Sequence, residues 1–148
     1  MNLLTTSTFW VIIYYMSKQY TTNKDIMFFI KYHLVFCPRY RRKIFLIEGL
    51  EDRFKELTEI SCKKQGIDVI SLVCHSDFVH VIVQAPPYLS IPFIVRSIKM
   101  ASSHVLRDEF SVLSAMPSLW TRGYFVSTED TVTPECIASY VSQLKTRP

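Results

Sequence analysis

The chain has 148 residues, of which 49% are hydrophobic and 14% are aromatic, and it contains only three glycines. This composition predicts one packed globular domain and excludes a disordered chain or two domains of ordinary size. The formal net charge of +4 is modest. It permits a polyanionic partner without predicting one, so the positions of the basic residues matter more than their number.

The four cysteines are widely separated and form no Cys-x-x-Cys pair, which argues against a structural zinc site. No stretch is typical of a secretory signal, so we expect reduced thiols in a cytoplasmic protein. The apolar run over residues 9–16 is much shorter than the roughly 20 residues that span a bilayer, so no membrane association is expected. We expect residues 1–25 to be an N-terminal extension: an extra strand, a docked or flexible arm, or residues translated from upstream of a natural start at Met16. Residues 26–148 are predicted to form the domain.

The first predicted strand is the aromatic and branched run of residues 27–37. A basic loop follows, and apolar residues at helical spacing then predict a helix over residues 47–65, ended by Gly66 as a left-handed cap. Two short apolar runs, residues 67–74 and 78–84, flank a polar turn. They predict an antiparallel hairpin.

Ser90 followed by Pro92 is typical of a helix start, and an apolar stripe continues from there. A loop is expected over residues 111–118 and a strand over residues 119–127. A Thr-Pro-Glu sequence opens a last helix, predicted over residues 133–145.

The predicted order is strand, helix, strand, strand, helix, strand, helix. Such an order indicates an α+β fold of the ferredoxin-like kind, with a mostly antiparallel sheet and helices packed on one face.

The most informative stretch is residues 77–83, which contains Phe78 and His80. Side chains two apart in a strand face the same side, so these two point into one site. Imidazole binds transition metals and, beside oxygen ligands, magnesium or manganese, whereas a phenyl ring cannot donate to a metal. His33 and His75 could replace the missing imidazole only if folding placed one of them nearby. The alternative for a single histidine in an apolar strand is a hydrogen-bonded core residue.

A second group of candidates is basic and surrounds an aromatic residue in one loop. Arginine and lysine there would neutralise phosphates, while Tyr40 would stack on an unpaired base. The alternative is a solvated loop. The candidate DNA-binding residues are Arg39, Tyr40, Arg41, Arg42 and Lys43 in the loop, and Arg96, Lys99 and Arg122 further along the chain.

Four segments together resemble one known family: residues 32–45, 77–87, 94–99 and 120–126. They resemble the small single-domain tyrosine transposases of the HUH superfamily, the type encoded by insertion sequences, over about residues 28–145. In that family two histidines of one strand hold a divalent metal that polarises the scissile phosphate. A tyrosine on a helix attacks this phosphate and becomes joined to the 5′ end of the DNA.

The resemblance implies that Tyr140 is the nucleophile and that His80 is a ligand of magnesium or manganese. The family commonly has a third ligand, usually glutamine, four residues beyond the tyrosine, where this chain has Leu144. Gln143 lies three residues beyond the tyrosine, close to the same helix face, and is the candidate to replace it. With Phe78 in place of the first histidine, the metal site is expected to be weak or absent.

The sequence thus predicts a DNA transposition protein that binds single-stranded or hairpin transposon ends. Its ancestral reaction is strand cleavage and transfer through a 5′-phosphotyrosine, impaired by Phe78. The resemblance also implies a homodimer in which the sheets merge and the tyrosine helix of one subunit completes the other's site. Two alternatives stay open: a catalytically inactive DNA-binding regulator or relic of the family, and an RNA-binding ferredoxin-like module, whose paired aromatics Phe28, Tyr32 and Phe78 match only loosely.

Overall fold

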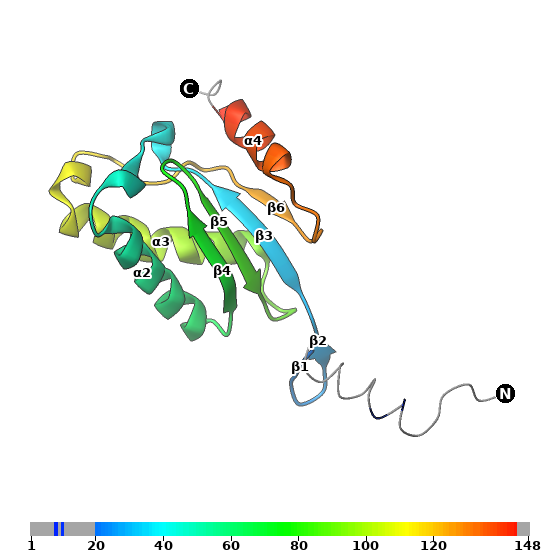
Figure 1. The fold of residues 1–148 in the computed structure, drawn as a ribbon. Coiled ribbons are helices and arrows are strands. Elements are labelled where there is room, and N and C mark those ends of the chain that lie inside the picture. The colour runs from blue at the N-terminus through cyan, green and yellow to red at the C-terminus, as the bar shows by residue number, and fades with distance from the viewer. Residues whose placement is uncertain (1–7, 9, 11–19, 145–148) are drawn as a thin grey trace. The chain divides into compact units, whose positions relative to one another are not determined.

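Branched and aromatic runs form a four-stranded antiparallel sheet in the computed structural model, which describes residues 8, 10 and 20–144 (Figure 1). The strands are β3 (Lys31–Phe36), β4 (Asp68–Cys74), β5 (Val79–Gln84) and β6 (Phe125–Ser127). Their order across the sheet is β4-β5-β3-β6, with antiparallel neighbours throughout. One helix follows β3 and another follows β5, so the predicted α+β, ferredoxin-like architecture is confirmed.

The α-helices within residues 20–144 are α2 (Leu50–Lys64), α3 (Ile91–Glu109) and α4 (Pro134–Gln143), and short 3-10 helices span Arg39–Arg41, Ile44–Leu46 and Ser111–Leu113. A side-chain cap marks the start of α3 and of α4. The side-chain oxygen of Ser90 accepts from the N–H of Phe93 at the start of α3, at 3.2 Å. Thr133 caps α4 in the same way through the N–H of Cys136, also at 3.2 Å. These bonds satisfy N–H groups that have no partner within the helix, as the sequence predicts.

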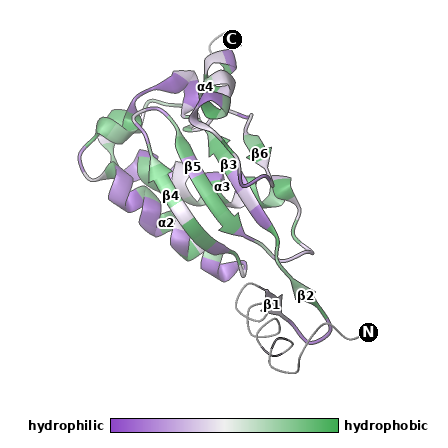
Figure 2. Ribbon diagram, turned by 45° about the vertical axis from the view of Figure 1, so that its right-hand side comes forward, coloured by the Kyte–Doolittle hydropathy of each residue, from purple (hydrophilic) through white to green (hydrophobic). Residues whose placement is uncertain are grey.

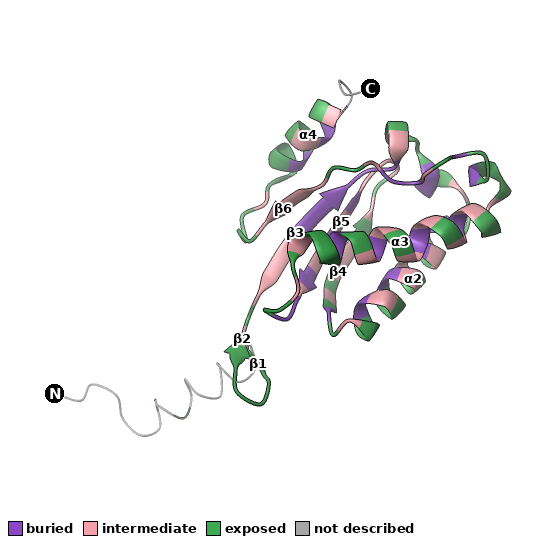
Figure 3. Cartoon of the chain, turned by 180° about the vertical axis from the view of Figure 1, so that it is seen from behind, coloured by how far each residue is buried: buried purple, intermediate pink, exposed green. Residues whose placement is uncertain are grey.

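Alternation along β3 sends successive side chains to opposite faces of the sheet. Leu34 and Phe36 are fully buried in the main core with residues of α2 and α3, and the Phe36 ring meets the Trp120 ring edge-on at 4.9 Å. Val35 and Cys37 belong to a second, smaller cluster with residues of α4. Helices α2 and α3 therefore cover one face of the sheet (Figure 3), and α4 packs on the other. The expectation that helices pack on one face holds for α2 and α3 but not for α4, because Ile137 and Val141 bury themselves against Val35 and Cys37 on the opposite face.

The apolar side of each element is the side that is buried. The strands of the sheet are mainly hydrophobic, whereas the outer side of α2 is hydrophilic (Figure 2). Each large side chain moved from water into the main core contributes about 1.5–3 kcal/mol, which offsets the entropy lost on folding.

Two predicted helices are shorter in the structure. The helix expected over residues 47–65 begins at Leu50, because Gly49 adopts a left-handed conformation with φ of 80°. The predicted end at Gly66 is confirmed: its φ is 73°, and the following N–H, that of Ile67, donates back to the helix. The last helix ends at Gln143, and its predicted end at residue 145 lies outside the described residues.

The strand expected over residues 119–127 is a strand only from Phe125. Before it, Trp120 makes an isolated bridge with Pro38. The carbonyls of Thr121 and Gly123 accept hydrogen bonds from the Lys99 ammonium and not from a neighbouring strand. A side chain of α3 therefore takes over acceptors that a longer strand would have paired.

Residues up to Ile30 form a separate unit from those after it. Within this first unit, β1 (Thr21–Thr22) pairs with β2 (Met27–Phe28) as a short antiparallel hairpin. The strand expected over residues 27–37 thus consists of two pieces. Most of the predicted N-terminal extension lies outside the described residues, so the assignment of residues 1–25 and 26–148 stays a prediction. Among the described residues, no helix combines the length and the apolar character needed to cross a membrane.

Candidate active site

Helix α4 carries Tyr140 over the sheet face opposite α2 and α3. Ile137 and Val141, on the inner side of the helix, are buried against Val35 of the central strand and anchor α4 there. The Tyr140 ring is partly exposed and lies 5.9 Å from the ring of Phe125 in β6. The helix therefore fixes Tyr140 at the edge of the second cluster.

The Tyr140 hydroxyl lies close to the backbone at Gly123. A methyl group added at this glycine would stand 3.5 Å from the hydroxyl oxygen and 3.9 Å from the Cδ2 atom of Leu144. At these distances the methyl group would make ordinary van der Waals contact, so the gap between α4 and the segment before β6 is about the size of a methyl group.

His80 and His33 form a pair on the same face of the sheet as α4. The Nδ1 atom of His33 and the Nε2 atom of His80 are 3.1 Å apart, and the ring centroids are 5.4 Å apart. Because the centroids are much further apart than these two nitrogens, the nitrogens point at each other. This is the geometry of an N–H···N hydrogen bond, in which one ring donates and the other accepts.

Both imidazoles are held neutral by their surroundings. Burial lowers the pKa of His33, with a smaller contribution from the Lys31 ammonium. Burial also lowers the pKa of His80, and the neighbouring His33 acts in the same direction. The neutral state is the one that can both donate and accept within the pair.

The residues around His80 do not fit the three-ligand metal site that the resemblance implies. Phe78 packs against the second cluster, with the His75 ring stacked on it at 4.1 Å, and cannot ligate. Leu144 is equally unable to ligate, while Gln143 is exposed at the end of α4. Within the described part of the chain, no group of three or more histidine, cysteine, aspartate or glutamate side chains could hold a metal ion. His33 does lie near His80, so these two imidazoles, and not positions 78 and 80, are the pair that the fold brings together.

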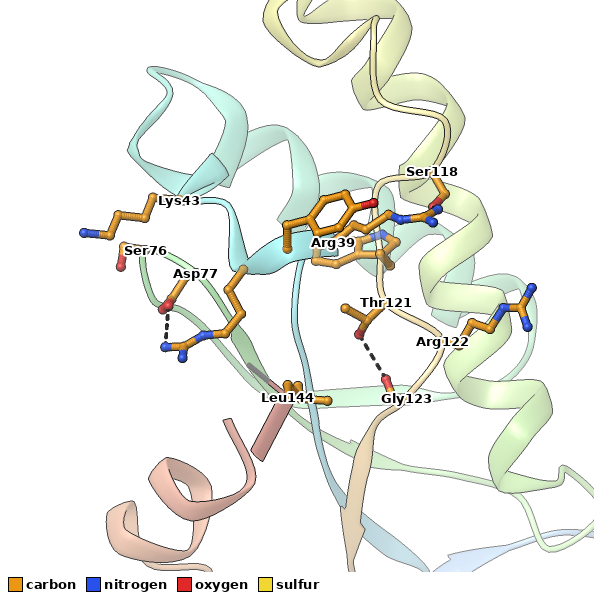
Figure 4. Close-up of a pocket in the computed structure, with 12 residues that line it drawn as sticks. Arg39, Lys43, Ser76, Asp77, Ser118, Thr121, Arg122, Gly123 and Leu144 are labelled. Atoms are coloured by element: carbon orange, nitrogen blue, oxygen red, sulfur yellow. Dashed lines mark hydrogen bonds and ion pairs between the residues drawn. The ribbon is translucent and has the colours of Figure 1, made fainter. Parts of the chain in front are cut away.

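The basic loop opens onto a groove of about 1300 Å³ (Figure 4). Cationic side chains of the loop and of residue 122 line it, together with polar groups and Leu144 at the end of α4. Its lining residues include Arg39, Tyr40, Arg41, Lys43, Asp77 and Arg122. A groove of this size and charge suits a phosphate backbone.

Internal contacts fix the loop in shape. Arg41 Nη2 lies 2.8 Å from Asp77 Oδ2 in a largely buried ion pair, which ties the loop to the turn before β5. Arg39 Nη1 donates to Ser118 Oγ at 2.7 Å. Tyr40 is 71% exposed, and Tyr40 and Arg41 have left-handed φ angles of 60° and 50°. Such conformations cost about 1–3 kcal/mol each in non-glycine residues and cluster at functional sites.

A second hollow of about 350 Å³ lies between α3 and the segment before β6. Arg96, Lys99 and Arg122 line it, with Trp120 and Tyr124 as its aromatic walls. Lys99 is turned inward: its Nζ atom donates to Thr121 O at 2.7 Å, and burial lowers its pKa to about 8.

Three features of this region have no signal in the local sequence. The His33–His80 bond depends on pairing between β3 and β5, and the role of Lys99 depends on the packing of α3, so neither leaves a local signal. The left-handed conformation at Tyr40 likewise leaves none, since tyrosine rarely adopts it.

The chain matches the family model of IS200-like transposases over residues 26–144. It belongs to the IS200-like transposase family. Two relatives, the transposases for insertion sequence element IS200 of Salmonella typhimurium and Salmonella typhi, are each 31% identical over 101 residues. The match covers 66% of this chain and 66% of each relative, so it spans slightly less than two thirds of their length. The ISDra2 transposase TnpA of Deinococcus radiodurans is 26% identical over 122 residues, which cover 80% of this chain and 86% of that protein.

Solved structures agree with the fold of an IS200-like transposase. A crystal structure of a Deinococcus radiodurans protein assigned as a transposase is similar with a TM-score of 0.76 and 25% identity, over 83% of this chain and 96% of that one. A REP-associated tyrosine transposase bound to a REP hairpin is similar with a TM-score of 0.53 and 10% identity, over 83% and 67% of the two chains. At this identity the second similarity shows the fold alone.

The structure of this family member brings most candidate residues to two neighbouring hollows. Of the eight predicted DNA-binding residues, Arg42 is the one that lines neither. The Tyr140 hydroxyl is buried beside Gly123, which lines the groove, whereas Tyr140 itself is not among the lining residues, and His80 is engaged with His33. The roles of these residues in DNA binding and cleavage stay predictions.

Proposed function

We propose that this IS200-like transposase binds single-stranded or hairpin DNA at transposon ends. The observation that carries the proposal is the groove of about 1300 Å³ with Arg39, Arg41, Lys43 and Arg122 in its lining. Cations along a groove attract the phosphates of a nucleic acid backbone, and the exposed Tyr40 ring offers a surface on which an unpaired base stacks.

Tyr140 is the proposed nucleophile of the ancestral cleavage reaction. Its hydroxyl is buried beside Gly123, a lining residue of the groove, so attack on a strand bound there requires the hydroxyl to become exposed to that strand. Attack by this oxygen on a phosphodiester would join the 5′ end to the protein and release the 3′ hydroxyl. A phosphoryl transfer also needs stabilisation of the developing charge, which Phe78 and Leu144 do not provide. Cleavage by the unmodified chain is therefore proposed to be impaired.

The second candidate is a non-catalytic DNA-binding regulator of the same family. The specific observation in its favour is the same pair of apolar residues, Phe78 and Leu144, at positions where the resemblance implies metal ligands. A homodimer and a cytoplasmic location remain part of the proposal for both candidates.

One experiment separates these functions. The purified chain is incubated with fluorescently labelled single-stranded, hairpin and duplex forms of a transposon end, with and without manganese, and binding is followed by anisotropy. A covalent adduct is then sought on a denaturing gel, with Tyr140→Phe as the control. We expect tighter binding to single-stranded or hairpin DNA than to duplex, with little adduct. Equal binding to all three forms would contradict the proposed substrate, and an efficient adduct that Tyr140→Phe abolishes would contradict the proposed impairment.

A further inference from the structure

Lys99 is placed to hold the backbone that precedes β6. Its Nζ atom donates to the carbonyls of Thr121 and Gly123 at 2.7 and 3.0 Å and lies 3.5 Å from that of Arg122. The ammonium also stands 5.4 Å from the ring centre of Phe36. A lysine ammonium has three donors, so these carbonyls together with the aromatic face account for its bonding capacity inside the protein.

The held segment lies beside α4, the helix that carries Tyr140, on its other side. Gly123, whose carbonyl accepts from Lys99, is also the residue at which an added methyl group would stand 3.5 Å from the Tyr140 hydroxyl oxygen. Lys99 belongs to α3, on one face of the sheet, and Tyr140 to α4, on the other. The two residues therefore reach the same short stretch of backbone from opposite sides.

The same stretch forms the wall between the two hollows. Ser118, Trp120, Thr121 and Arg122 line both. Its near end is fixed to the central sheet, since the N–H of Thr121 donates to the carbonyl of Cys37 at 3.0 Å. The part after Thr121, which Tyr140 contacts, is irregular until β6 begins at Phe125. Lys99 supplies hydrogen bonds to this part that a strand neighbour would otherwise give.

We propose that Lys99 is a positioning residue for Tyr140. By bonding the backbone of residues 121–123, it fixes the position of the segment beside which the tyrosine hydroxyl lies, next to the proposed DNA groove. This inference rests on the proposed role of Tyr140. It differs from the expectation that Lys99 contacts DNA phosphate, because the ammonium is already bonded to three backbone carbonyls. Without Lys99 the carbonyls of Thr121 and Arg122 lose the lysine donor, the carbonyl of Gly123 keeps only the 3.5 Å hydrogen bond from Thr121 Oγ1, and the segment is free to shift beside the hydroxyl.

The test follows Tyr140 directly, in the full chain labelled with 3-fluorotyrosine. The ¹⁹F resonance of Tyr140 is assigned by its loss in Tyr140→Phe. In Lys99→Met we expect this resonance to shift or to split into two environments, with the other tyrosine resonances, apart from that of the neighbouring Tyr124, unchanged. Lys99→Arg, which keeps donors at the site, is expected to restore a single resonance near the original position. A simple loss of packing would not be rescued in this way.

Arg96→Met is the matched control, because Arg96 lies on the same helix, lines the same second hollow and is exposed. Single-stranded DNA affinity is measured against salt for both variants. Arg96→Met should leave the Tyr140 resonance in place and lower the salt slope by roughly 0.7, the value for one phosphate of a single strand that is no longer neutralised. Lys99→Met should change the Tyr140 resonance and leave the salt slope as it is in the parent chain.

A Lys99→Met protein with an unchanged Tyr140 resonance would overturn the proposal, and a reduced salt slope in that protein would make Lys99 a phosphate ligand. If the parent chain binds no DNA, the proposed function fails, but the resonance still decides the role of Lys99. Should Lys99→Met not fold, Gly123→Ala is the second variant, because its added methyl group would contact the Tyr140 hydroxyl at an ordinary van der Waals distance of 3.5 Å. We expect it to shift the Tyr140 resonance and to leave those of the other tyrosines, apart from Tyr124, unchanged. An unchanged Tyr140 resonance would show that the hydroxyl does not lie beside residues 121–123 and would overturn the proposal.

Discussion

Phe78 shows how one side chain alters the chemistry available to a whole site. It packs with Val35, Ile137 and Val141 between the sheet and α4, where its ring adds apolar contact. A histidine there would face the same side of the sheet as His80. Phenylalanine in place of histidine at position 78 therefore adds buried apolar contact and removes the imidazole that would have bound a metal together with His80.

Restoring the implied ligands tests this interpretation. In a Phe78→His, Leu144→Gln double variant we expect manganese affinity to rise, because an imidazole and an amide oxygen replace two groups that cannot ligate. Adduct formation at Tyr140 should rise with it. Isothermal titration with manganese alone and a gel assay with single-stranded ends measure the two effects. A folded double variant that binds DNA but neither binds metal nor reacts would mean that residues 78 and 80 are wrongly aligned with the family's histidine pair.

The His33–His80 pair predicts a loss of stability in mild acid. The pKa of each imidazole is lowered in the folded chain, mainly by burial, so below about pH 6.5 the unfolded chain binds more protons than the folded one. Stability therefore rises with pH up to that value and falls as the pH drops below it, by at most about 1.4 kcal/mol per pH unit for each histidine.

Urea denaturation at pH 7.5 and 5.5 measures this effect. We expect the loss between the two pH values to be smaller in His33→Gln than in the parent chain. His104→Gln is the control, because His104 is exposed on α3 and pairs with Asp108 at the surface. An equal loss in the parent chain and in His33→Gln would show that the pair does not titrate as expected.

At the scale of elements, the basic loop, α3 and α4 meet around the segment before β6. The loop is held to the turn before β5 by the Arg41–Asp77 ion pair and to Ser118 by Arg39. Internal bonds of this kind give the loop a fixed shape, which would reduce the entropy lost if the loop binds DNA. A phosphate bound by Arg41 would compete with the Asp77 carboxylate for the guanidinium.

For the loop, we predict that Arg41→Ala combined with Arg42→Ala weakens binding to single-stranded DNA of any sequence. The salt dependence should flatten by roughly 0.7 for each phosphate that the variant no longer neutralises. Anisotropy titrations at several salt concentrations measure both quantities. Lys63→Ala combined with Lys64→Ala, at the far end of α2, is the charge-matched control and should leave them unchanged. If the loop variant binds like the parent chain, the loop is merely solvated.

At the scale of the whole molecule, one sheet carries helices on both faces but has an open edge. β4 is an edge strand, and Ile70 and Val73 in it are 51% and 45% exposed. Exposed apolar residues on an unpaired edge are typical of a surface that pairs with another chain. This is compatible with the homodimer that the resemblance implies.

We therefore expect a dimer at micromolar concentration, with an interface above about 1,000 Å². Light scattering coupled to size exclusion measures the mass. Ile70→Lys combined with Val73→Lys should yield a monomer, whereas Val112→Lys, at an exposed position outside the sheet, should not. A monomeric parent chain would contradict the dimer itself. A dimer that survives the double substitution would place the interface elsewhere.

The sequence by itself determined the element types, the order of the fold and the end of α2, because these depend on local patterns. Apolar alternation marks strands, Ser90 and Thr133 mark helix starts, and Gly66 marks a stop, each through interactions within a few residues. It also identified Tyr140 and the basic loop as candidates through their resemblance to a family.

Only the tertiary structure decided which side chains meet. The His33–His80 bond requires the register in which Val35 stands opposite His80, and that register is fixed by the core and not by either histidine. From the sequence, Lys99 is expected to be a cation at the surface. In the fold its ammonium donates to the backbone carbonyls of Thr121 and Gly123, because the packing of α3 brings it to a segment that is not in a strand. Contacts between residues far apart in the chain follow from burial of the whole core, which no local pattern records.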